Sequence, residues 1–191
     1  MGIKSQASAE ELSSPFYIRN KSVCEDFEAY ISQLGGETTG SYNAWSYNVK
    51  GRIDAPLRWI FQLKKSSYYG GQLLVSTKKQ SLQLWTIWKC KNLETDFSDF
   101  IVRKKRFGDS LRVLSSPSVN DFQNRKKYVI VSSLRNHPLA NQLSSILKFC
   151  LNDQSLLEMT YIDNELIIQI DTEQILKNKF KELINEKFNR L

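Results

Sequence analysis

An alternation of apolar and polar residues runs through residues 45–64 and constrains the fold more than any other feature. Apolar side chains occupy nearly every second position there: Trp45, Tyr47, Val49, Ile53, Leu57, Trp59, Phe61 and Leu63. A period of two is typical of strands that have one face in the core and the other in water. Pro56 fits a turn or the start of a strand, so it separates two such strands. An antiparallel meander is therefore expected here.

Further strands are predicted from apolar runs that are rich in β-branched and aromatic residues. They lie at residues 72–77, 82–90, 100–103, 111–114, 128–132, 157–162 and 165–170. Asp163 and Asn164 separate the last two strands and form a two-residue hairpin signal.

Three helices are predicted from apolar residues at helical spacing, over residues 23–34, 138–152 and 172–189. Ser22 and Glu25 match a capping box for the first helix, which two glycines at 35–36 would end. Pro138 suits the first turn of the second helix, with Asn136 or His137 as its cap.

The grouping of these elements favours an α+β fold. Hairpin-connected strands with helices between and after them predict mostly antiparallel sheet built from meander and hairpins, with three helices packed on one face. We expect residues 1–15 to be a flexible N-terminal tail and residues 16–191 to be a single domain, with a possible subdivision near 93–98.

The charge balance favours binding over catalysis. The chain has one histidine, and its 27 lysines and arginines exceed 20 acidic residues to give a net charge of +7. Histidine is the usual proton-transfer group near neutral pH, whereas positive charge attracts anionic partners. No phosphate-binding loop, dinucleotide fingerprint, nucleophile elbow or HExxH motif occurs, so we expect neither an enzyme nor a cofactor site.

The residues that could carry catalysis have simpler structural explanations. His137 has no second histidine or cysteine beside it, which favours a helix cap over a metal ligand or a general base. The acidic pairs are explained by helix ends, turns and solvated loops; they are Glu25 with Asp26, Asp96 with Asp99, and Asp163 with Glu165. A hydrolase that uses carboxylates would need two of them to face each other in a pocket.

Localisation is expected to be the cytoplasm or the cytoplasmic face of a membrane. Cys24, Cys90 and Cys150 are widely spaced in apolar segments, which is typical of buried free thiols in a reducing compartment. The sequence has neither a run of eighteen apolar residues nor a secretory signal near its N-terminus. An excised part of a longer membrane protein would look the same.

Clustered basic residues are the remaining candidates for a binding site. They are Arg103, Lys104, Lys105, Arg106, Arg125, Lys126, Lys127, Lys64 and Lys65. Such clusters can follow a phosphate backbone or dock on anionic lipid headgroups. Lysines at strand ends also serve as solubility and edge-protection devices without a partner. No RNA-binding signature is present.

The second half resembles the soluble part of uncharacterised bacterial membrane-tethered proteins. The segments that carry this resemblance are DFIVRKK, KKYVIVSS, HPLANQLSSILKFC and LEMTYIDNELIIQID. Residues 48–52 correspond to the glycine-centred strand that precedes this region in those proteins, and the resemblance spans residues 22–188. The membrane helices of such proteins are missing from this sequence. The resemblance implies no activity.

The sequence thus predicts a non-enzymatic interaction module with a basic surface and an anionic or protein partner. A peripheral domain that associates with anionic lipid is the alternative, and a carboxylate-dependent hydrolase is the second alternative. The oligomeric state and the choice between nucleic acid, lipid and protein stay open.

Overall fold

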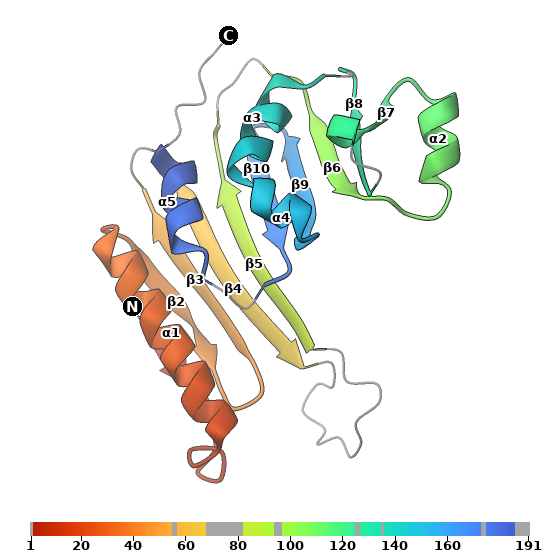
Figure 1. The fold of residues 1–191 in the computed structure, drawn as a ribbon. Coiled ribbons are helices and arrows are strands. Elements are labelled where there is room, and N and C mark those ends of the chain that lie inside the picture. Colours follow the sequence, from red (N-terminus) through yellow and green to blue (C-terminus); the bar gives the residue numbers. More distant parts are fainter. Residues whose placement is uncertain are drawn as a thin grey trace. The chain divides into compact units, whose positions relative to one another are not determined.

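The computed structural model describes residues 2–54, 57–67, 82–93, 97–124, 127–134, 136–172 and 175–185. These residues contain ten strands, five α-helices and one 3-10 helix, and most of the defined strand pairs are antiparallel. The expected α+β class is therefore confirmed (Figure 1). The strand expected at residues 72–77 lies outside the described residues.

Strands and helices are interspersed along the chain. The strands are β1 (Ile3–Ser5), β2 (Glu37–Tyr42), β3 (Tyr47–Ile53), β4 (Trp59–Ser67), β5 (Leu82–Cys90), β6 (Phe100–Lys104), β7 (Val119–Asp121), β8 (Tyr128–Ser132), β9 (Leu156–Ile162) and β10 (Glu165–Ile170). The helices are α1 (Pro15–Gln33), α2 (Asp109–Ser115), α3 (Pro138–Ile146), α4 (Lys148–Asn152) and α5 (Lys177–Asn185), with the 3-10 helix η1 at Phe122–Asn124.

The chain forms two compact units that interleave along the sequence. The first comprises Met1–Ala55, Ile60–Ile87 and Asp171–Ile175, and the second comprises Pro56–Trp59, Trp88–Ile170 and Leu176–Leu191. The subdivision considered at residues 93–98 lies inside the second unit.

In the first unit the strands follow the order β1-β2-β3-β4-β5, and α1 packs on β2 and β3 (Figure 1). β3 alternates in burial as its sequence predicts, with Val49 and Ile53 buried and Lys50 exposed. A Cβ atom at Gly51 would lie 2.4 Å from Ile31 Cγ1, so this glycine allows α1 to approach the sheet closely.

The N-terminal segment and the start of α1 differ from what the sequence predicts. Residues Ile3–Ser5 form β1, which pairs in parallel with β2, and the Gln6 amide donates a hydrogen bond of 2.8 Å to the Tyr42 carbonyl. The capping box at residues 22 and 25 is wrong, because α1 begins at Pro15 and is capped by Ser14. The helix starts earlier than predicted because its buried side continues toward the N-terminus through Asn20. This residue is polar, so the apolar spacing in the sequence does not reveal that it is buried.

In the second unit the strands follow the order β10-β9-β6-β8-β7, and their pairing is antiparallel. The predicted hairpin is confirmed, since Asp163 and Asn164 both have positive φ, 50° and 60°, as a type I′ turn requires. The start of the second helix is also confirmed, because His137 caps α3 and Pro138 is its first residue. This helix then ends at Ile146, and α4 follows after Leu147.

A helix occupies the place of the strand expected at residues 111–114. Gly108, with φ of 90°, precedes α2, and Asp109 lies buried in the first turn. Gly108 and Asp109 set the position at which the helix starts, and the spacing of Leu111 and Leu114 alone does not reveal this start. Figure 1 shows α2 beyond β7 and β8 at the outer edge of this unit.

Aromatic side chains fill the core of the second unit below α5. Phe180 lies 5.9 Å from Trp59 and 5.5 Å from Trp88 between ring centroids, and all three side chains are fully buried. Among the described residues, no helix is both long enough and apolar enough to cross a membrane.

Candidate docking surface

The predicted basic residues fall into separate groups. Lys64 and Lys65 lie on β4 in the first unit, whereas Arg103, Lys104, Lys105, Arg106 and Lys127 lie in the second. Arg125 and Lys126 lie outside the described residues.

The two lysines of β4 interact with neighbouring side chains of the first unit. Lys64 Nζ lies 4.9 Å from the centre of the Trp85 ring, a cation–π distance. Lys65 Nζ donates a hydrogen bond of 2.9 Å to Asn20 Oδ1 and lies 6.0 Å from the Tyr47 ring. Asn20 in turn donates to the carbonyls of Asn43 and Ala44, so Lys65 belongs to a network that ties α1 to the β2–β3 turn.

Arg103 is held by a carboxylate within its own unit. Its guanidinium donates two hydrogen bonds to Asp109, of 2.6 and 3.0 Å, and the two side chains are only 12% and 3% exposed. The Arg106 amide donates a third bond, of 2.6 Å, to the same carboxylate. Together these donors hold the pKa of Asp109 well below its usual range. This pair fixes the loop between β6 and α2.

Lys105 also has an acidic partner. Its Nζ lies 2.6 Å from Asp121 Oδ1 on β7, and its amide donates to the Lys127 carbonyl. Lys105 therefore ties the end of β6 to its neighbours.

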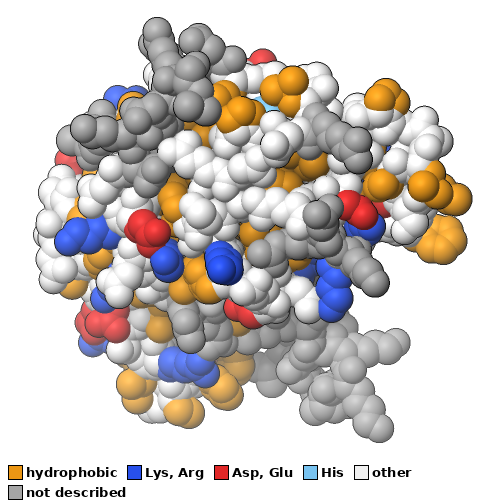
Figure 2. All heavy atoms as spheres, turned by 45° about the horizontal axis from the view of Figure 1, so that its top comes forward, with side chains coloured by type: hydrophobic (Ala, Val, Ile, Leu, Met, Phe, Trp, Pro, Cys, Tyr) orange, Lys and Arg blue, Asp and Glu red, His pale blue; other side chains and the backbone are white. Residues whose placement is uncertain are grey.

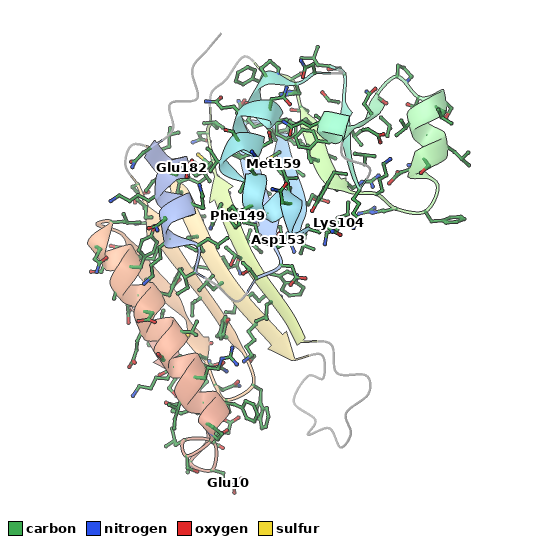
Figure 3. All side chains as sticks on the ribbon, in the orientation of Figure 1. Glu10, Lys104, Phe149, Asp153, Met159 and Glu182 are labelled. Atoms are coloured by element: carbon green, nitrogen blue, oxygen red, sulfur yellow. The ribbon has the colours of Figure 1, made fainter. Side chains whose placement is uncertain are left out.

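Four cations on β6, on α2, in the loop between them and just before β8 form no ion pair with any described residue. Arg106 and Lys127 belong to the predicted clusters and are exposed, and Lys104 is half-buried at the end of β6 (Figure 3). Arg112 on α2 is exposed as well and was missed, because it lies outside any basic run. We call Lys104, Arg106, Arg112 and Lys127 the free cations.

Three large apolar side chains are exposed beside the free cations. Phe107, Leu111 and Leu114 are 110%, 72% and 85% exposed, which is more than the other large apolar residues of the described chain. Leu111 and Leu114 are three residues apart on α2 and so lie on one side of that helix, whereas Phe107 lies in the loop before it. Figure 2 shows hydrophobic side chains at the right-hand edge of the molecule, with both basic and acidic side chains beside them. Helical spacing was the signal that could have revealed the two leucines. We call residues 104–116 the α2 projection.

Two of the described carboxylates line a groove and are held by neighbouring side chains. A groove in the first unit is lined by Glu28, Ser32, Gly36, Glu37 and Thr38. Glu28 accepts a hydrogen bond of 2.7 Å from Thr38, and Glu37 lies 3.3 Å from Arg52, so both carboxylates hold β2 and its neighbours in place. Among the residues that the structure describes, no group of three His, Cys, Asp or Glu side chains could hold a metal ion.

His137 and the cysteines are buried. His137 Nδ1 accepts a bond of 3.4 Å from the Ala140 amide, and Nε2 lies 2.7 Å from the Ser98 carbonyl oxygen. The neutral ring with its proton on Nε2 satisfies both contacts, and burial lowers the pKa of His137. Burial raises the pKa of Cys24, Cys90 and Cys150 to about 12, so none is a reactive thiolate near neutral pH.

The chain was compared with protein-family models and with curated proteins. No family model and no curated protein matches it.

Proposed function

We propose that the chain is a non-enzymatic binding module that docks an anionic partner through the α2 projection. The observation that carries this proposal is the set of free cations together with exposed apolar side chains on α2 and in the loop before it, which we call the apolar stripe. Surface cations alone are ordinary, but large apolar side chains exposed beside them favour an interaction site.

The electrostatics of the α2 projection support an anionic partner. Asp109 is the only acidic residue between positions 103 and 118, and Arg103 neutralises it. Lys105 is likewise paired with Asp121. The four free cations therefore remain available to a ligand, and positive charge that no carboxylate offsets attracts polyanions over about a Debye length.

The base of the α2 projection is also tied to its neighbours by several polar contacts. Three hydrogen bonds to Asp109 fix the loop, and the Lys105–Asp121 ion pair fixes its base. A surface that is ordered before binding loses less conformational entropy in the complex. We also keep as part of this proposal the expectation from the sequence that three helices pack on one face of the sheet.

We place this activity in the cytoplasm or at the cytoplasmic face of a membrane. The three buried cysteines are free, which supports a reducing compartment.

Heparin chromatography tests the proposal with two variants of equal charge. One changes the free cations to glutamine (K104Q/R106Q/R112Q/K127Q). The other removes four exposed lysines elsewhere (K50Q/K91Q/K148Q/K181Q). We expect the wild type and the second variant to elute at similar salt and the first at clearly lower salt, because only the first loses the site. Equal shifts would show that net charge alone governs retention, and the proposal would be wrong.

A further inference from the structure

We infer that the anionic partner is the surface of a lipid bilayer, and that Phe107, Leu111 and Leu114 enter its interfacial region. This inference rests on the proposed function and adds the class of partner.

The first step is that the apolar stripe does not serve the fold. α2 has an inner side, on which Asp109 is buried and Val113 is half-buried, and it packs against β7. Leu111 and Leu114 lie on the other side of α2, Phe107 lies in the loop before it, and all three side chains are left in water. Removing these side chains from water is favourable. The fold does not bury them, so their burial against a partner would favour binding.

The second step is the arrangement of charge around this stripe. Arg106 precedes Phe107 directly, Arg112 follows Leu111, and Lys104 lies at the base of the same loop. Apolar side chains with basic neighbours suit a membrane interface, where the apolar groups enter the acyl boundary and the cations meet lipid phosphates. A bilayer that contains anionic lipid is therefore complementary to the α2 projection in both polarity and charge.

The third step excludes other anionic partners on chemical grounds. Nucleic acid binds cations together with aromatic rings on which bases stack, but two of the three side chains in this stripe are leucines. A second copy of the chain would bring another net charge of +7 to the contact. An acidic protein would need a pocket shaped to three protruding side chains, whereas the lipid interface adapts to them.

Cosedimentation with vesicles tests the inference, using phosphatidylcholine alone and phosphatidylcholine mixed with phosphatidylglycerol. We expect binding to the mixed vesicles only, with affinity reduced about tenfold or more in F107S/L111S/L114S and in the free-cation variant. The control L12S/I18S/L134S removes three exposed apolar side chains elsewhere and should bind like the wild type. Thermal melts of the same samples check that each variant is folded.

Each outcome bears on one claim. Retention on heparin that depends on the free cations, without vesicle binding, would overturn the lipid inference and leave the proposed function standing. Vesicle binding that F107S/L111S/L114S leaves unchanged would overturn insertion of the stripe. Retention on heparin that does not depend on the free cations would contradict the proposed function itself.

Discussion

Arg103 and Arg106 carry the same charge within one basic run, yet their surroundings give them different roles. Arg103 is almost buried against Asp109, whereas the side chain of Arg106 is exposed and forms no ion pair with a described residue. A buried pair is expensive to break from one side, because the remaining carboxylate keeps its charge without its partner. At an exposed position the loss of a cation changes the free energy of unfolding very little.

Replacing Arg103 should therefore destabilise the fold, and replacing Arg106 should not. We expect Arg103→Ala to lower the free energy of unfolding by about 3 kcal/mol. Arg106→Ala should change it by less than about 0.5 kcal/mol and act on heparin retention instead. Urea denaturation of the two variants measures this difference. Equal losses of stability would show that the Arg103–Asp109 pair does not hold the loop.

At the scale of elements, the residues at helix ends and turns determine whether the boundaries can be predicted from the sequence. α3 has His137 and Pro138 at its start and is predictable from them, and the β9–β10 hairpin is predictable from Asp163 and Asn164. The predicted start of α1 is too late because two cap signals compete, Ser14 before Pro15 and Ser22 before Val23. Local chemistry fits both, and only the burial of Tyr17 and Asn20 against the rest of the unit selects the earlier start.

The position of the true cap can be tested by two serine replacements in α1. Ser14 Oγ accepts a hydrogen bond of 3.3 Å from the Phe16 amide, so Ser14→Ala should cost about 1 kcal/mol of stability. Ser22 is exposed within the helix, where alanine has the higher helix propensity, so Ser22→Ala should be neutral or slightly stabilising. Chemical denaturation gives both values. A larger loss at residue 22 than at residue 14 would restore the later start.

At the scale of the whole molecule, regular patterns were predictable and tertiary pairing was not. The α+β class follows from alternation such as that of β3, which the packed sheet preserves. The free cations could not be separated from Arg103 and Lys105 in advance, because their partners Asp109 and Asp121 meet them only when β6, α2 and β7 come together. Arg112 and the apolar stripe escaped notice because residues 111–114 fit a short strand equally well.

Composition and burial together predict how the stability of the whole chain depends on pH. With one histidine in the sequence, His137 is the side chain whose ordinary pKa of 6.5 lies between about pH 5 and 8. Its pKa is lower in the folded state, because burial disfavours the charged ring and its contact with Ala140 needs an unprotonated Nδ1. Below about pH 6.5 the unfolded chain binds a proton that the folded chain does not.

The free energy of unfolding should therefore change little around pH 7.5 and should fall as the pH drops toward 5, by at most about 1.4 kcal/mol per pH unit. Urea denaturation at closely spaced pH values measures this slope. His137→Asn keeps a cap acceptor for the Ala140 amide but has no group that titrates, so its stability should be nearly independent of pH over the same interval. If the variant kept the slope of the wild type, the proton uptake would have to come from other groups, and His137 would not be the neutral link between α3 and Ser98.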